Sequence, residues 1–243
     1  MNEEFSSSWI WEHVNELRKR LFYALIGLIV CVLGSFAFTE QIIQFMTRPV
    51  GGLDALQAIE VTENVSVYMK TALLSGFIIS LPWILFQLLK FILPGLKEKE
   101  KKWLFSAIPL ASLLFVGGVA FAFFVMLTPA IQVMTEFLDI TTTLRVKSYM
   151  DFVTNLLFWI GVIFEFPLIF FVLAKLKIVN AKGLLKGWRI AVVLIAVLAA
   201  MITPTVDPVN MALFMIPLFI LYLLSILLAA IAGKNRSHTT EGD

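Results

Sequence analysis

Three glutamates lie where a carboxylate could bind a basic group. Glu165 is the one charged residue in the apolar run from Phe158 to Leu173. An acidic residue at the centre of a membrane helix costs about 2.5–3.5 kcal/mol, so it usually faces a cavity or a partner inside the bundle. Glu16 and Glu100 lie instead in the charged segments HVNELRKRL and KEKEKK. Exposed carboxylates can accept charge-assisted hydrogen bonds from the guanidinium groups of a basic peptide. The alternatives are an interfacial helix with routine ion pairs for Glu16 and a loop that only follows the positive-inside rule for Glu100.

Two interpretations of Glu165 remain open from the residues alone. Pro167 follows two positions later and cannot donate to the carbonyl of Ile163, so the local backbone also carries a free acceptor. In the functional interpretation, this polar spot receives a partner helix, a substrate or a proton. In the structural interpretation, the carboxyl group bonds to Asn155 or a nearby hydroxyl and only fixes helix packing.

The sequence carries no pattern of enzyme chemistry. It lacks the GxSxG, HExxH, Walker A and GxGxxG motifs. Its one cysteine, Cys31, lies in an apolar run, and its two histidines, His13 and His238, are far apart in sequence. We therefore expect a protein that is not an enzyme and has no cofactor and no metal site.

The composition predicts an all-α integral membrane protein. Hydrophobic residues make up 60% of the chain and charged residues 15%, whereas soluble domains are about half apolar and a quarter charged. Backbone groups inside lipid must bond within their own segment, so each long apolar run is expected to be a helix. The prediction is an amphipathic helix over 1–20, a membrane domain over 21–231 and a disordered tail over 232–243. The six expected spans are 21–38, 67–89, 103–127, 152–173, 190–202 and 209–231.

The distribution of positive charge predicts the orientation. If the N-terminus lies in the cytoplasm, every lysine and arginine falls on the cytoplasmic side except Arg48, Lys70, Arg145 and Lys147. This asymmetry follows the positive-inside rule and places both termini in the cytoplasm. The amphipathic helix also carries Glu16 and Arg20 four residues apart, in the order that favours an ion pair.

The fifth span is too short for an ordinary bilayer. Its 13 residues give about 20 Å of helix, against a hydrocarbon thickness of about 30 Å. One interpretation is a span that thins the bilayer, with Lys186 and Arg189 reaching towards the headgroups. The alternatives are a re-entrant pair with the sixth helix, or a short helix buried among others.

Five segments, read in order, resemble one family. HVNELRKRL (13–21) resembles the HLxELRxRL signature of TatC, the large membrane subunit of the twin-arginine protein translocase. Further similarities are ENVSVYMK (63–70), LPWILFQLLKFILPGLKEKEKK (81–102), FEFP (164–167) and ITPTVDPVNMALFMIPLFILY (202–222). The resemblance covers roughly residues 10–225. It implies a glove-like concave bundle with short fifth and sixth helices.

The resemblance also implies roles for particular residues. It makes Glu16 and Glu100 the carboxylates that meet consecutive arginines of a signal peptide, and it places Glu165 and Gln87 at intramembrane contacts with partners. Leu223 stands where many relatives have a glutamate. The supporting cytoplasmic motif comprises His13, Leu17, Arg18, Arg20, Pro94 and Gly95, and the outer-side motif comprises Glu63, Lys70 and Asp207.

The expected function is a signal-peptide receptor and core subunit of this translocase. It would export folded proteins across the cytoplasmic membrane using the proton gradient. The expected partners are twin-arginine signal peptides, TatA-type and TatB-type single-span subunits, further copies of the chain and membrane lipid, with no nucleic acid. The alternative is a proton-coupled small-solute or ion transporter that uses Glu165.

Overall fold

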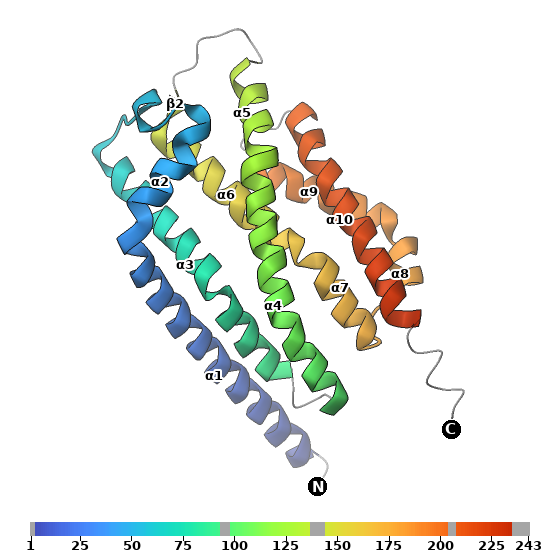
Figure 1. The fold of residues 1–243 in the computed structure, drawn as a ribbon. Helices are drawn as coiled ribbons and strands as arrows, with labels where there is room; N and C mark the ends of the chain where they lie inside the picture. The colour runs from blue at the N-terminus through green and yellow to red at the C-terminus, as the bar shows by residue number, and fades with distance from the viewer. Residues whose placement is uncertain (1–2, 93–97, 137–143, 204–207, 235–243) are drawn as a thin grey trace.

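The computed structural model describes residues 3–92, 98–136, 144–203 and 208–234, and these residues are almost entirely helical (Figure 1). The expectation of an all-α membrane protein is therefore confirmed. The α-helices are α1 (Glu3–Ser35), α2 (Thr39–Thr47), α3 (Val61–Ile92), α4 (Glu98–Phe121), α5 (Leu127–Glu136), α6 (Val146–Phe164), α7 (Phe166–Lys175), α8 (Ala181–Lys186), α9 (Trp188–Ile202) and α10 (Pro208–Lys234). Short 3-10 turns at Phe36–Phe38, Arg48–Val50 and Leu53–Ala55, a π-helical turn at Ala122–Met126 and the two-residue strands β1 (Leu56–Gln57) and β2 (Leu144–Arg145) complete the described elements.

Five helical segments in the described residues are long and apolar enough to cross a membrane. Helix α9 is apolar but shorter, with 15 residues, or about 22 Å of rise. Helix α10 corrects one expectation, because it has 27 residues and is not short. Pro217 is accommodated inside α10 without ending it, and the helix continues to Lys234. The rest of the predicted C-terminal tail lies outside the described residues.

The helices pack as neighbours in an order that differs from their order in sequence. Helix α1 runs along α3, α6 contacts both α3 and α4, and α7 packs against α10 (Figure 1). The first turn of α1 and the last turn of α10 lie towards the same end of the bundle (Figure 1). We call the half that contains these two turns the terminal half, and the half that contains α2, β1 and β2 the capped half.

Helix α1 is attached by one face to α3. Gly27 allows this approach, since a Cβ atom there would lie 2.2 Å from the Trp83 ring. The Trp83 indole Nε1 donates a hydrogen bond of 2.9 Å to the carbonyl of Tyr23. Elsewhere α1 exposes large apolar side chains such as Leu25 and Val30, as expected for a helix that faces lipid.

The capped half closes the bundle with polar contacts between distant segments. Strand β1 pairs in parallel with β2, so the connection before α3 is joined to the connection before α6. The Tyr68 hydroxyl donates to the carbonyl of Phe36, and the Tyr149 hydroxyl donates to the carbonyl of Met46, both at 2.7 Å. These bonds fix α2 and its flanking turns against α3 and α6.

Candidate functional site

The signature segment at the start of α1 presents a carboxylate that is already paired. Arg20 Nη2 donates to Glu16 Oε1 at 3.3 Å, one helical turn away. The side chains are 31% exposed for Glu16 and 25% exposed for Arg20. A half-exposed i,i+4 pair stabilises a helix by only about 0.3–0.5 kcal/mol. The Glu16 carboxylate is therefore held in place but remains open to exchange of its partner.

Other residues of the same segment connect α1 to the end of α3. The His13 ring packs edge-on against Phe91, with ring centroids 6.5 Å apart. Leu17 is 37% exposed, and Arg18 is exposed. His13 and Leu17 lie near Glu16 on α1, whereas Arg18 lies on the opposite side of the helix.

Glu100 lies in the first turn of α4, which begins at Glu98, shortly after α3 ends at Ile92. Because α1 packs along α3 and His13 touches Phe91, the start of α4 lies in the same half of the bundle as Glu16. The side chain of Glu100 lies outside the described part of the chain, as do Pro94 and Gly95 altogether. The structure thus places Glu100 in the first turn of α4.

Glu165 occupies a one-residue break between α6 and α7. Helix α6 ends at Phe164 and α7 begins at Phe166, because Pro167 has no N–H to continue the ladder. The Glu165 N–H bonds to the carbonyl of Val162 at 3.1 Å, and its carbonyl accepts from Ile169 at 2.9 Å. The predicted disturbance of the helix by Pro167 is confirmed.

Glu165 itself is 8% exposed, and its Oε1 has no hydrogen-bond partner among the described residues. The bond to Asn155 that the structural interpretation offers is not formed in this structure. Asn155 is exposed and lines a separate pocket of about 330 Å³ with Lys70. A buried carboxyl oxygen without a partner costs free energy unless a ligand or another group satisfies it.

Two glycines set the position of Glu165 by letting α4 and α6 interlock. A Cβ atom on Gly118 of α4 would lie 2.7 Å from the ring of Phe164, and one on Gly161 of α6 would lie 2.8 Å from the ring of Phe115. Each helix thus receives a phenylalanine of the other against bare backbone. This contact fixes Phe164, and with it the neighbouring Glu165, against α4.

Gln87, the second predicted intramembrane residue, is also buried, with 4% exposure and an unpaired Oε1. It lies near the end of α3 in the terminal half. No hydrogen bond joins it to Glu165 in the described residues. The two side chains thus share a property, an acceptor oxygen without a partner, rather than a bond.

Glu63, predicted as part of the outer-side motif, is a structural residue of the capped half. Its side chain is 0% exposed, and its Oε1 accepts from Arg145 Nε at 2.6 Å and Nη2 at 2.5 Å. The same oxygen accepts from the N–H of Glu60 at 3.0 Å, which caps the start of α3. Arg145 also pairs with Glu60 at 3.0 Å, and its hydrogen bonds to Glu63 raise its pKa above the ordinary value.

Lys70, two turns after Glu63 on α3, has a similar structural role. Its Nζ lies 2.6 Å from Asp151 Oδ1, and Lys147 Nζ lies 3.0 Å from Asp151 Oδ2. Asp151 therefore joins α3 to α6 through its contact with Lys70, whereas its contact with Lys147 lies within α6, one turn away. Asp207, the third member of the outer-side motif, lies outside the described residues. No group of three or more His, Cys, Asp or Glu side chains in the described residues could hold a metal ion.

Comparison with known proteins identifies the family. A sequence model of the family described as Sec-independent protein translocase protein (TatC) matches residues 12–217. The chain belongs to the TatC family. It is 32% identical over 223 residues to the TatC protein of Carboxydothermus hydrogenoformans, covering 90% of this chain and 92% of that protein. It is 33% identical over 237 residues to the TatC protein of Deinococcus radiodurans, covering 94% and 88%.

A solved TatC structure has the same fold. A crystal structure described as the twin arginine translocase receptor TatC superposes with a TM-score of 0.81 at 31% identity, covering 90% of this chain and 99% of that one. The resemblance seen in the sequence is thereby confirmed. TatC membership favours a protein translocase over a small-solute transporter, and it establishes a multi-pass membrane protein of the Tat system.

Sequence reasoning did not identify several residues that shape these sites. Arg145 and Asp151, the partners of Glu63 and Lys70, are about 80 residues away from them in sequence. Opposite charge on the same side of the membrane was the available signal, but it could not select the pairs. Trp83 and the glycines Gly118 and Gly161 gave no signal of their own.

Proposed function

We propose that this protein is the signal-peptide receptor and core subunit of a twin-arginine translocase. In this proposal it lies in the cytoplasmic membrane with both termini in the cytoplasm, and the terminal half faces the cytoplasm. It recognises folded precursor proteins through consecutive arginines in their signal peptides. The proton gradient drives export, and the protein acts as a receptor rather than as an enzyme.

The loosely held carboxylate of Glu16 is the observation that carries this proposal. Its partner Arg20 is on the same helix and contributes little stability, so an arginine of a bound peptide can replace it at small cost. Guanidinium binds carboxylate through a planar fork of two N–H donors, which lysine does not have. Recognition at Glu16 would therefore prefer arginine to lysine although both carry the same charge.

Glu100 supplies the second carboxylate for the second arginine. Its helix starts in the same half of the bundle as Glu16, and its position corresponds to the second carboxylate in the motif of the family. Two carboxylates on different helices would discriminate a pair of arginines from a single one. His13 and Leu17 lie beside Glu16 on α1 and would contact the peptide next to the pair, whereas Arg18 lies on the other side of the helix.

Glu165 and Gln87 extend the path into the membrane. Each has a buried acceptor oxygen without a partner, which a donor on an incoming helix could satisfy. The apolar part of a signal peptide and the single-span TatA-type or TatB-type subunits are the helices proposed to do so. Further copies of this chain complete the assembly.

The direct test is co-purification of the full chain in detergent with a precursor that carries a twin-arginine signal. A twin-lysine precursor and the Glu16→Ala and Glu100→Ala variants should each reduce the bound precursor about tenfold or more, because a hydrogen bond to a charged group contributes about 1.5–3 kcal/mol. Glu98→Ala is the matched control, since it removes a carboxylate two positions from Glu100 and should leave binding unchanged.

Two results would contradict the proposal. One is equal capture of the twin-arginine and twin-lysine precursors. The other is a loss of binding in Glu98→Ala as large as in Glu100→Ala, which would show that only the summed negative charge of the loop matters.

A further inference from the structure

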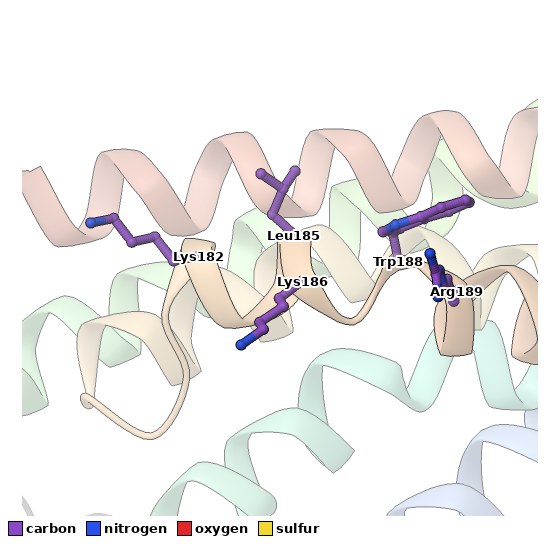
Figure 2. Close-up of a pocket in the computed structure, with 5 residues that line it drawn as sticks. All are labelled: Lys182, Leu185, Lys186, Trp188 and Arg189. Atoms are coloured by element: carbon purple, nitrogen blue, oxygen red, sulfur yellow. The ribbon is translucent and has the colours of Figure 1, made fainter.

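An open pocket of about 700 Å³ lies at the junction of α8 and α9, lined by Lys182, Leu185, Lys186, Trp188 and Arg189. Lys182 and Lys186 lie on α8, before the junction, and Trp188 and Arg189 lie next to each other at the start of α9 (Figure 2). Three of the five lining residues are cations. Within the described residues, no acidic side chain lines this pocket.

The three positive charges of the pocket are not neutralised by the protein. Lys182, Lys186 and Arg189 form no ion pair with any residue of the described chain. The Arg189 guanidinium lies over the Trp188 ring at 5.8 Å from the centroid. Arg189 makes no hydrogen bond or ion pair with the described residues, so its N–H donors are available to a ligand. The pocket therefore offers donors and positive charge to an anion from outside the chain.

The depth of the pocket makes the anion a membrane component. Helix α8 is fixed against α10 by a hydrogen bond of 2.5 Å from the Tyr222 hydroxyl to the carbonyl of Leu184. Tyr222 lies about 18 Å of helix rise before the end of α10 at Lys234. Ala181 and Leu184 of α8 also pack with Ala229 and Ala232, so α8 lies along the second half of α10, and the 15 residues of α9 cover the remaining distance to the capped half. Uncompensated cations at such a depth draw headgroups inward and thin the bilayer.

The surface beside the pocket suits acyl chains. Trp188 is 51% exposed, and the outward face of α9 continues with Ile190 at 69% and Val193 at 62%. Leu185, on the pocket wall itself, is 58% exposed. A phosphate dissolved in water would use only the charged part of this surface, whereas a lipid would use the charged and apolar parts together. Tryptophan with lysine and arginine at one level is also typical of a membrane interface.

We infer that the α8–α9 pocket binds the phosphate headgroup of an anionic membrane lipid, with the acyl chains along the exposed face of α9. The positive-inside rule explains why cations lie in this half of the protein. It does not explain why three cations and Trp188 line a single pocket beside the second half of α10. Basic pockets between membrane helices are known to accept anionic headgroups. This site is separate from the carboxylates proposed for signal recognition.

The test uses the full chain in nanodiscs that contain phosphatidylcholine and phosphatidylglycerol. Native mass spectrometry then measures how much phosphatidylglycerol stays bound when the protein is released. The Lys182→Gln/Lys186→Gln variant should retain about tenfold less phosphatidylglycerol than the unchanged chain, since each basic residue near an anionic surface contributes measurably to attraction. Lys19→Gln/Lys90→Gln is the matched control: it removes two lysines of the terminal half outside the pocket and should retain as much lipid as the unchanged chain.

A second arm separates a lipid from a free anion. Glycerol phosphate and inorganic phosphate are added to the released complex, and neither should displace the bound phosphatidylglycerol at millimolar concentration. Displacement by either compound would overturn the lipid assignment. Equal loss of lipid in the two double variants, or no loss in either, would overturn the site itself.

Discussion

The capped half and the terminal half of the bundle hold their charged side chains in different ways. In the capped half, Arg145 bridges Glu60 and buried Glu63, and Asp151 binds Lys70 and Lys147. The contacts of Arg145 with Glu60 and Glu63 and that of Lys70 with Asp151 join segments that are distant in sequence, whereas Lys147 and Asp151 pair within α6. In the terminal half, the carboxylate of Glu16 meets a partner on its own helix, and the pocket residues Lys182, Lys186 and Arg189 form no ion pair with the described residues.

This difference separates charges that hold the structure from charges that are free to bind. Satisfied ion pairs between elements fix the connections of the capped half, and an incoming ligand would have to break them. In the terminal half, Lys182, Lys186 and Arg189 form no ion pair with the described residues, and Glu16 pairs only within its own helix. The two halves should therefore respond oppositely to substitution, with stability affected in the capped half and binding affected in the terminal half.

The largest effect on stability is expected from Arg145→Ala. The substitution leaves the Glu63 carboxylate buried without a partner and also removes the pair with Glu60. Because breaking a buried pair is strongly destabilising, the melting temperature in detergent should fall by at least about 5 °C. Arg48→Ala is the control, since Arg48 lies in the same half and only stacks on Phe45. Equal melting temperatures for the two variants would remove the basis of the comparison.

An increase in stability is expected from Glu165→Leu. The substitution removes a buried oxygen without a partner, so the melting temperature should rise by about 2–4 °C. The same variant should no longer recruit single-span subunits in a co-purification assay. Glu165→Gln is the control, since it keeps a polar group of the same shape and should leave the melting temperature unchanged. A fall in melting temperature for the leucine variant would instead make Glu165 part of the structural framework.

The smallest effect on stability is expected from Arg20→Gln. The lost pair with Glu16 is half-exposed and lies within one helix, so the melting temperature should change by no more than about 1 °C. Arg18→Gln, an exposed neighbour on the same helix, should give the same result within error. A fall as large as that of Arg145→Ala would show that Glu16 is committed to the fold and not free to bind.

The sequence predicted the features that depend on local chemistry. The apolar runs became helices because lipid forces backbone groups to bond within the segment. The break at Glu165 followed from Pro167, and the short fifth helix from the 13 apolar residues before Thr203. The i,i+4 order of Glu16 and Arg20 likewise predicted their contact.

The features that depend on packing were not predictable. Pro82, Pro109 and Pro217 lie inside continuous helices, whereas Pro167 interrupts one, and nothing local to the sequence distinguishes them. The pairing of Glu63 with Arg145 requires α3 and α6 to be neighbours, which periodicity does not show. The pocket at α8 and α9 likewise depends on the level at which Tyr222 holds α8.

The interruption at Glu165 divides the fourth span into two helical segments with different neighbours. Helix α6 packs on α3 and α4, whereas α7 packs on α10. Helix α7 has ten residues and is about 15 Å long, so a bend of about 10° at Glu165 would move its far end by roughly 2.6 Å. If a helix docks on Glu165 as proposed, such a bend would be transmitted to α10, the helix that packs against α7.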